Sequence, residues 1–303
     1  MAADSADSAD SAAPFTDLGR SPLREGALNR ALVHPGGLWR RIEVLPALGS
    51  TNSELVHRAR QGAPEGEVLV TEHQTAGRGR LDRGFQTPKR AALTFSVLVR
   101  PDVPTGRLGW LPLLMGTAAV RALSRTAAVP AALKWPNDVL ATGADGVERK
   151  LAGILSEAAF AENSTGVVIG MGLNVAQRRD ELPVGSATSL ALEGAARTGR
   201  EPLLQAVLHG FADLYAEWER RGGDAEASGL ADEYRRHCGT IGRTVRVHLP
   251  GDRILQGRAT GVDAEGQLTV RAEDGTEEAL SAGDVVHVRP ADGSAGYSAH
   301  RIP

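Results

Sequence analysis

A short segment that follows an apolar run combines arginine and glycine at unusual density. Its six members are Gly77, Arg78, Gly79, Arg80, Arg83 and Gly84. Arginine presents a planar fork of N–H donors that suits phosphates and carboxylates, and glycine lets a backbone come close to a ligand. We therefore expect a mobile loop that closes over an anionic ligand. A solvated basic loop is the alternative, and for this segment taken alone it is the better interpretation.

Other segments of the chain also carry polar side chains of the kind that bind ligands. They are Gly49-Ser50-Thr51-Asn52, Gln74, Lys134-Trp135-Pro136-Asn137-Asp138, Lys150-Leu151-Ala152-Gly153-Ile154-Leu155-Ser156-Glu157, and the glycine-rich run with Gly170, Gly172 and Asn174. Each has a structural interpretation of its own: a helix cap, a tight turn after a proline, or a lysine at the end of a strand. It is their occurrence together that favours a binding site.

Hydrophobic spacing and turn residues predict a mixed α/β fold followed by a small all-β module. Helices are expected over 53–61, 108–124 and 203–218, and strands over 67–71, 93–99, 132–134, 139–141, 150–157 and 166–175. After Gly239 the pattern changes to short strands separated by turns, which is typical of a β-barrel-like module. The polar segments thus lie at strand ends, in turns and at one helix start.

Four parts of the chain are expected. Residues 1–37 form a mostly disordered tail, because the chain begins with an acidic, low-complexity Asp-Ser-Ala repeat. Residues 38–238 form the α/β domain, residues 239–290 the β-module, and residues 291–303 a flexible tail. Fewer than forty residues precede Leu38, too few for an additional helix-turn-helix domain with its own core.

Composition narrows the class of protein. Hydrophobic residues make up 42% and charged residues 23% of the chain, as in ordinary globular proteins. The net charge of −3 gives no overall attraction to nucleic acid. The single cysteine, Cys238, excludes an internal disulfide and suits a reducing compartment. Neither a signal peptide nor an apolar run long enough for a membrane span is found, so we expect a cytoplasmic protein.

The set of motifs, in this order, resembles the biotin–protein ligases, of the monofunctional type without a DNA-binding domain. The resemblance extends from about Leu38 to Arg289. It implies a mixed β-sheet backed by helices, with a C-terminal SH3-like barrel. It also implies a two-step reaction. Biotin and MgATP give biotinyl-5′-AMP and pyrophosphate, and the biotinyl group then passes to one lysine of a biotin carboxyl carrier domain of acyl-CoA carboxylases. The implied cofactors are therefore ATP and Mg²⁺, with biotin as substrate.

The same resemblance assigns roles to residues. Lys150 contacts the biotin carboxylate and the α-phosphate, Arg80 and Arg83 clamp the phosphates, and Asp138 orients or deprotonates the acceptor lysine. Residues expected to bind biotin or nucleotide are Ser50, Thr51, Asn52, Gln74, Gly77, Arg78, Gly79, Arg80, Lys134, Trp135, Asn137, Lys150, Gly153, Gly170, Gly172 and Asn174. Trp135 and Asn174 are expected near the adenine, and the loop arginines are expected to lack anionic partners until phosphates arrive. Residues that hold Mg²⁺ are not assigned.

Two positions depart from the family pattern, and two other functions compete. Asp82 stands where glycine is usual, and Phe85 where tryptophan is usual. A lipoate–protein ligase or octanoyltransferase of the same superfamily is the first alternative, although an octanoyltransferase needs a cysteine in its core and Cys238 lies at the junction to the β-module. The second is a biotin-sensing transcriptional repressor, which would require a DNA-binding domain.

Overall fold

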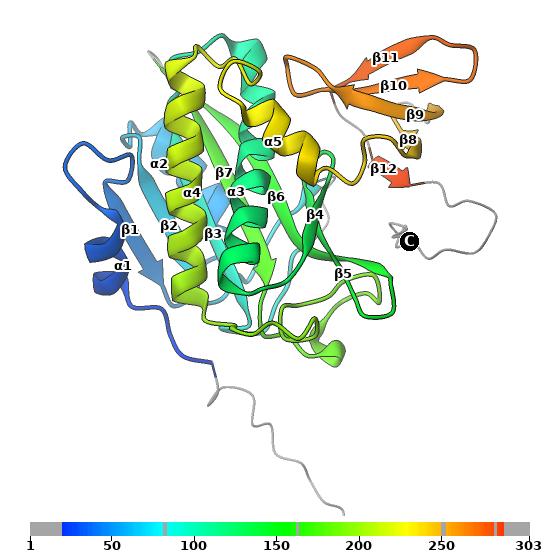
Figure 1. Ribbon diagram of the computed structural model, residues 1–303. Coiled ribbons are helices and arrows are strands. Elements are labelled where there is room, and N and C mark those ends of the chain that lie inside the picture. Colours follow the sequence, from blue (N-terminus) through cyan, green and yellow to red (C-terminus); the bar gives the residue numbers. More distant parts are fainter. Residues whose placement is uncertain (1–19, 81–83, 162–163, 250–252, 282–283, 288–303) are drawn as a thin grey trace, which may run out of the picture.

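The computed structural model describes residues 20–80, 84–161, 164–249, 253–281 and 284–287 (Figure 1). Its main element is a seven-stranded sheet with the strand order β1-β2-β3-β7-β6-β5-β4, in which only β1 and β2 run parallel. The strands are β1 (Arg41–Leu45), β2 (Glu67–Thr71), β3 (Ala92–Val99), β4 (Ala131–Lys134), β5 (Asp138–Thr142), β6 (Glu148–Ala161) and β7 (Ser164–Asn174). The predicted mixed α/β fold is therefore confirmed.

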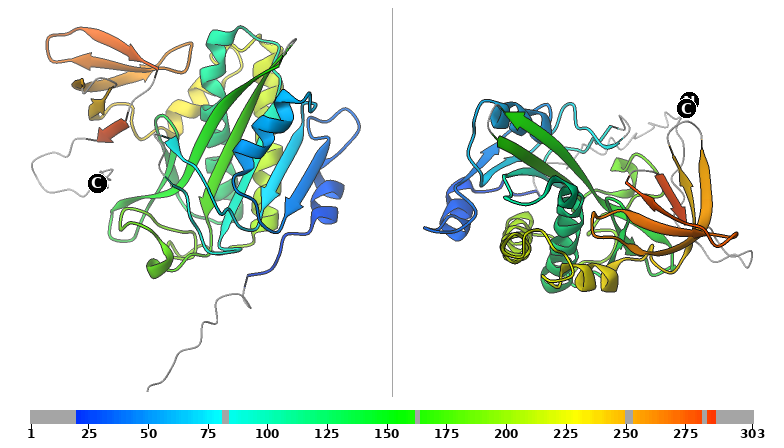
Figure 2. Two further views of the ribbon diagram at one scale, coloured as in Figure 1. Left: turned by 180° about the vertical axis from the view of Figure 1, so that it is seen from behind. Right: turned by 90° about the horizontal axis from the view of Figure 1, so that it is seen from above.

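Helices cover both faces of this sheet (Figure 2). The helix α2 (Thr51–Arg60) packs on one face, where Leu55 and Ala59 form a small apolar cluster with strand residues such as Leu69. On the other face lie α3 (Trp110–Thr126) and α4 (Arg200–Arg220), whose apolar sides join the main core. All residues of β3 are buried as a result, and the strand is apolar except for Thr94 and Ser96.

The expected tail through residue 37 is wrong for residues 20–37. Residues Glu25–Leu32 form the helix α1, and Leu28 and Leu32 are buried in the main core against the sheet and α4. The sequence signal is weak because this helix has only eight residues and no side-chain cap. Its stability therefore comes from tertiary packing rather than from propensity. The acidic repeat and the expected tail at 291–303 lie outside the described residues.

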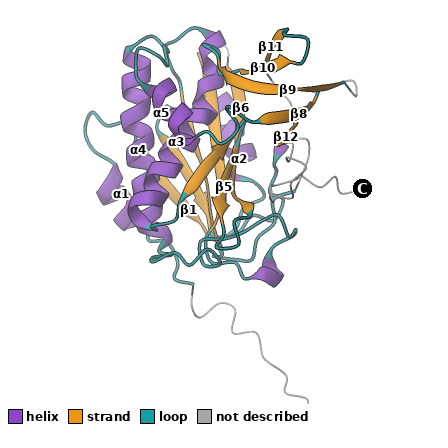
Figure 3. Cartoon of the chain, turned by 45° about the vertical axis from the view of Figure 1, so that its right-hand side comes forward, coloured by secondary structure: helices purple, strands orange, loops and turns teal. Residues whose placement is uncertain are grey.

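The C-terminal part is a second, five-stranded antiparallel sheet with the order β11-β10-β9-β8-β12. It consists of β8 (Thr244–His248), β9 (Ile254–Val262), β10 (Leu268–Ala272), β11 (Glu277–Leu280) and β12 (Asp284–His287), and follows the helix α5 (Leu230–His237). Over the described ranges no pairing joins the edge strands β11 and β12, so the structure gives an open sheet where the resemblance implied a barrel. Loops gather at the far end of the large sheet, away from this module (Figure 3).

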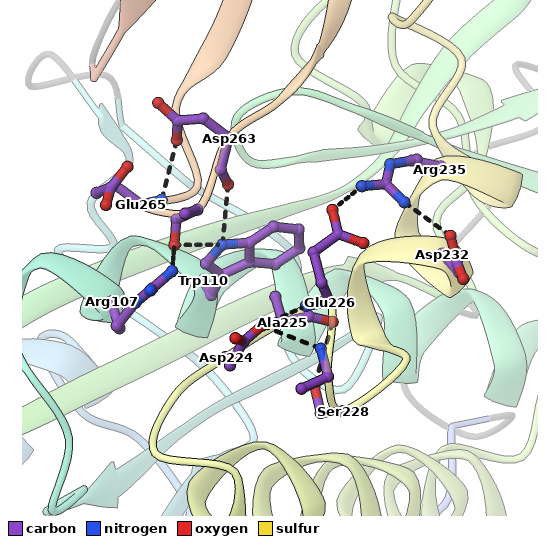
Figure 4. Close-up of polar contacts among 12 residues, drawn as sticks. Arg107, Trp110, Asp224, Ala225, Glu226, Ser228, Asp232, Arg235, Asp263 and Glu265 are labelled. Atoms are coloured by element: carbon purple, nitrogen blue, oxygen red, sulfur yellow. Dashed lines mark hydrogen bonds and ion pairs between the residues drawn. The ribbon is translucent and has the colours of Figure 1, made fainter.

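The turn between β9 and β10 fastens the C-terminal sheet to the large domain (Figure 4). The Trp110 indole donates to the carbonyls of Asp263 and Ala264 at 3.2 and 3.1 Å, and Arg107, in the 3₁₀ helix η2 (Thr105–Gly109), donates to Ala264 at 2.8 Å. A Cβ at Gly109 would lie 2.2 Å from the carbonyl oxygen of Glu265. The two backbones can therefore meet here only because this residue is glycine.

If α1 is part of the core, Leu28→Ala should lower the free energy of unfolding by about 2–5 kcal/mol, because it leaves a cavity beneath the helix. Urea denaturation followed by circular dichroism measures this. Arg30→Ala removes an exposed side chain of the same helix and serves as the control, with an expected change within about 0.5 kcal/mol. Equal, small effects of both variants would show that α1 does not pack as described.

Candidate functional site

Most of the predicted site residues line one cavity of about 640 Å³ on the α2 side of the large sheet. Those on its wall are Ser50, Thr51, Asn52, Gln74, Arg78, Gly79, Arg80, Asn137, Asp138, Lys150, Gly153, Gly170, Gly172 and Asn174. They come from the start of α2, the loop after β2, the β4–β5 turn, and the strands β6 and β7. The fold therefore brings together segments that are far apart in the sequence.

One end of the cavity is a buried network of polar side chains. Ser50 caps α2 by accepting from the backbone N–H of Ser53. The Gln74 side-chain oxygen accepts from the Thr51 backbone N–H at 2.8 Å, and the Ser96 hydroxyl lies within 2.8 Å of the Thr51 hydroxyl and 2.6 Å of Asn52 Oδ1. These side chains hold one another in place, so this end of the cavity is rigid before any ligand binds.

Glycines on β6 and β7 make room for the side chains that lie over them. A Cβ on Gly170 would lie 1.9 Å from Asn52 Oδ1, and one on Gly172 would lie 2.6 Å from the Phe85 ring. A Cβ on Gly153 would lie 3.1 Å from Lys150 Nζ. These glycines thus allow other side chains to come close to the sheet, as expected for glycine inside a strand.

The centre of the cavity contains an ion pair between Lys150 and Asp138. Lys150 Nζ lies 2.6 Å from Asp138 Oδ1, and both side chains are partly exposed to the cavity. Asn137 fixes the turn that carries Asp138, because its side chain donates to the Ile154 carbonyl at 2.9 Å and its carbonyl accepts from the Ile154 N–H at 2.9 Å. A cation and a carboxylate thus share the middle of the site.

Arg78 and Arg80 already have partners, contrary to the expectation from the sequence. Arg78 forms an ion pair with Glu157, which also accepts from Asn52, and Arg80 donates to the Asn137 side-chain oxygen at 3.3 Å. The strand β6 is long enough to place Glu157 opposite the loop, which the sequence interpretation did not consider. Arg83 and Asp82 lie outside the described residues. Gly77 is not on the cavity wall; a Cβ there would lie 2.1 Å from the Phe85 carbonyl oxygen.

The segment between β7 and α4 closes the other end of the cavity, and we call residues 177–187 the 177–187 wall. Lining positions in it include Gln177, Glu181 and Val184. Asn174 connects it to the sheet, since its Nδ2 donates to the Thr188 carbonyl and its Oδ1 accepts from Gln177. The far end of the wall pairs with β6: Lys150 N–H donates to the Ser186 carbonyl at 2.8 Å.

Lys134 and Trp135 are predicted site residues that do not line this cavity. Both are buried, and the Trp135 indole donates to the carbonyl of Gly266 in the C-terminal sheet at 3.1 Å. Trp135 borders a second cavity of about 710 Å³ between the two sheets. The structure therefore places this indole at the domain junction, and the sequence interpretation missed this contact because it depends on a residue 131 positions away.

A cluster of charged groups lies at the same junction. Arg243 forms a bidentate ion pair with Glu148 at 2.6 and 2.7 Å and donates to His287 Nδ1. The nearby His287 ring and Arg243 guanidinium, opposed by burial, lower the pKa of the Glu148 carboxyl to about 2. Burial lowers the pKa of His287, and the charges of Lys134 and Arg243 contribute. The Thr240 hydroxyl contacts His287 Nε2 and accepts from the Trp135 N–H, so this cluster also supports the β4–β5 turn.

Several residues of the site carry no sequence signal strong enough to have been selected. Ser96, Glu157, Gln177 and Glu181 are in this group. Ser96 occupies an alternating strand position, and Glu157 ends the Lys150 motif. Only these two of the four could therefore have been selected from a sequence pattern. Among the described residues, no group of three or more His, Cys, Asp or Glu side chains could hold a metal ion. No described helix is both long and apolar enough to cross a membrane.

Comparison with protein families identifies the class. Residues 45–174 match the biotin/lipoate A/B protein ligase family, and residues 240–288 match the biotin protein ligase C-terminal domain. The chain is 42% identical over 275 residues to the biotin–[acetyl-CoA-carboxylase] ligase of Mycobacterium tuberculosis, covering 89% of this chain and 97% of that protein. The chain therefore belongs to the biotin/lipoate protein ligase family, in its branch with a biotin protein ligase C-terminal domain.

Other relatives extend this result. The bifunctional ligase/repressor BirA of Bacillus subtilis is 31% identical over 239 residues, which cover 78% of this chain and 70% of that protein. Among solved structures, the biotin protein ligase from Aquifex aeolicus in complex with biotin and ATP superposes with a TM-score of 0.67 at 26% identity, covering 83% of this chain and all of that one. The fold and the recognised family agree with the resemblance seen in the motifs.

Gly170→Ala should destabilise the protein, because its Cβ would displace the buried Asn52 side chain from its contacts with Ser96 and Glu157. We expect a loss of about 1–3 kcal/mol in the free energy of unfolding, as for overpacked cores. Denaturant titration of the purified variant measures it. Gly49→Ala lies close by in the sequence, where a Cβ would meet nothing within 4 Å, and should be neutral. A neutral Gly170→Ala would mean that the network can rearrange freely.

Proposed function

We propose that this chain activates biotin with ATP to biotinyl-5′-AMP and transfers the biotinyl group to a lysine of a biotin carboxyl carrier domain. The observation that carries the proposal is the Lys150–Asp138 pair at the centre of a cavity that has a polar, preorganised end. Family membership and the similarity to a biotin–[acetyl-CoA-carboxylase] ligase support it. A cavity of about 640 Å³ also has the volume of a small-molecule site.

The polar end of the cavity suits the ureido ring of biotin. This ring is neutral and amide-like, so it needs a few fixed donors and acceptors rather than a countercharge. Ser50, Thr51, Asn52 and Gln74 offer such groups on the wall. Because they are held by one another and by Ser96, little side-chain entropy is lost when the ring binds. Biotin would then lie across the glycines of β6 and β7, with its carboxylate toward Lys150.

The first chemical step joins two anions, a carboxylate and the α-phosphate of ATP. Cationic donors must lower the repulsion between them, and preorganised charge is the most effective means. Lys150 lies between the polar end and the 177–187 wall, where both groups could reach its ammonium. We assign Arg78, Arg80 and Arg83 to the phosphates. For Arg78 this requires that the ligand replace Glu157. The Arg78–Glu157 pair is partly exposed and is therefore easily broken.

The second step needs a neutral amine, because a protonated lysine is not a nucleophile. Asp138 is the carboxylate that we assign to orient or deprotonate the acceptor lysine. Asn137 and the β5–β6 pairing hold its backbone. In the absence of ligand Lys150 neutralises it. When Lys150 turns to the substrate carboxylate and phosphate, Asp138 becomes available to the incoming amine. One ion pair thus serves both steps.

In this proposal Mg²⁺ is bound through the nucleotide. The described residues provide no cluster of three metal-binding side chains, and Mg²⁺ in nucleotide sites is bound largely through phosphates and water. When bound, the ion would neutralise the departing pyrophosphate. We propose Asn174, which lines the cavity, for the nucleotide, and we assign the buried Trp135 to the domain junction rather than to the adenine.

The remaining assignments rest on the sequence. We propose residues 38–238 as the biotin- and ATP-binding domain and residues 239–290 as the C-terminal domain, with α1 joined to the former. The only cysteine, Cys238, is buried beside Leu133 and does not line the main cavity, which disfavours an octanoyltransferase that acts through a cysteine. Nucleic acid is not expected as a partner, and we propose the cytoplasm as the location because the chain can form no internal disulfide.

Mass spectrometry of adenylate formation tests the function directly. The purified protein is incubated with MgATP and either biotin, lipoate or octanoate, and the acyl-adenylates are measured. We expect the adenylate from biotin alone, followed by a mass increase of a carrier-domain substrate. Activation of lipoate or octanoate without biotin would replace the proposal by the superfamily alternative.

Lys150→Ala should lower the rate of adenylate formation by about 100-fold or more, because one positioned cation at the developing charge is lost. Single-turnover assays with biotin and MgATP measure the rate. Arg149→Ala is the matched control, since this neighbouring cation pairs with Asp145 in the β5–β6 turn and does not line the cavity. A folded Lys150→Ala variant with the wild-type rate would remove Lys150 from the proposed chemistry.

A further inference from the structure

The residues before α1 are fixed across the end of the large sheet by a buried ion pair. Glu72, directly after β2, and Arg200, at the start of α4, lie 2.6 Å apart, and both side chains are only 6% exposed. Glu72 also accepts from the Leu23 N–H at 2.6 Å, and Arg200 donates to the Ser21 carbonyl at 2.7 Å. The segment at residues 20–24 is therefore held by the core rather than lying loosely on it.

This segment ends at the cavity. The Arg20 guanidinium donates through Nη2 to the Ala176 carbonyl at 2.8 Å and to Glu181 Oε2 at 2.6 Å. Glu181 lines the main cavity as part of the 177–187 wall, and its carboxylate also accepts from the Arg178 N–H. Only 10% of each side chain of the Arg20–Glu181 pair is exposed, so this pair is among the better shielded ones at the cavity.

The charge of Glu181 matters because of where it lies. Burial alone would raise the pKa of this carboxyl, but the Arg20 guanidinium and the Arg178 N–H outweigh burial and hold the pKa below its usual range. Glu181 is therefore an anion at neutral pH, in the wall of a cavity proposed to receive a triphosphate. The Arg178 guanidinium also pairs with Glu181, at 3.8 Å, but it is 55% exposed and therefore screened by water. Without Arg20, Glu181 would repel such a ligand, and strongly, because only 10% of its side chain is exposed.

We propose that Arg20 is a positioning residue for nucleotide binding: it neutralises Glu181 and so keeps the 177–187 wall compatible with a polyanion. The inference rests on the proposed ATP-dependent activation. It assigns a role to a segment whose sequence suggests a disordered tail. Arg20 need not touch the nucleotide, because it acts through Glu181 on the cavity wall.

Arg20→Met tests this by a change in KM. It keeps much of the length of the side chain but exposes the Glu181 charge, so the KM for ATP should rise about tenfold. Biotin binding without nucleotide, measured by calorimetry, should change less than twofold, because the polar end of the cavity has separate contacts. The increase in KM should shrink at high salt, since salt screens charge repulsion, whereas a disturbed fold would not respond in this way.

Three further variants sharpen the experiment. Arg20→Lys keeps the charge and should retain a KM near that of the wild type. Glu181→Gln added to Arg20→Met should restore most of the affinity for ATP, because the repelling charge is gone. Arg24→Met is the control from the same segment: Arg24 pairs with Glu201, is 76% exposed, and does not line the cavity.

The outcomes separate this inference from the proposed function. If the wild-type protein forms no adenylate from biotin, the proposed function fails. If it does, three results would each overturn the inference. They are a wild-type KM for ATP in Arg20→Met, an equal loss of biotin and ATP binding in that variant, and an increase in its KM for ATP that high salt does not reduce. Should Arg20→Met not fold, Glu181→Gln alone decides. It should lower the KM for ATP, because the repelling carboxylate is gone while the charges of Arg20 and Arg178 remain; an unchanged or higher KM contradicts the role of the pair.

Discussion

The cavity depends on two adjacent strands that lack side chains where they face α2. Gly153 of β6 pairs in register with Gly172 of β7, and Gly170 pairs with Leu155. The space over these glycines is filled from elsewhere: Lys150 lies over Gly153, Phe85 over Gly172 and Asn52 over Gly170. A side chain at any of them would displace a group from the site. Side chains normally pack the faces of a sheet. Because these glycines have none, contacts from neighbouring segments must compensate for the missing packing.

That compensation comes from three directions. The start of α2 supplies a hydrogen-bonded network that holds Asn52, the 177–187 wall is joined to β6 at Ser186, and the C-terminal sheet supports the β4–β5 turn through the Thr240 hydroxyl and the Gly266 carbonyl. The last of these contacts connects the C-terminal domain to the turn that carries Asp138. Trp135, held at its backbone and at its indole, fixes the start of the turn that ends in Asp138.

The sequence predicts those features that depend on local chemistry. Ser50 caps α2, Lys134 and Asp138 lie at the ends of β4 and β5, and the glycines of β7 mark close approach, all as expected from spacing and residue type. Features that depend on distant partners were missed. The helix α1 is formed through burial of its leucines, and Glu157 acts on a loop 79 positions earlier in the chain. The expected unpaired Arg78 was wrong for this reason, since nothing near Arg78 in the sequence reveals its partner.

Three cations around the cavity are matched by carboxylates, and their exposure indicates which pairs a ligand can open. Arg78 and Glu157 are 51% and 27% exposed, Lys150 and Asp138 are 33% and 15%, and Arg20 and Glu181 are each 10%. Exposed pairs contribute little stability, so an incoming anion can replace Glu157 at small cost. Breaking a shielded pair leaves an uncompensated charge, which costs far more. The order of exposure therefore predicts exchange at the loop first and at Lys150 next. On the same basis the Arg20–Glu181 pair should remain intact, because it is the least exposed of the three.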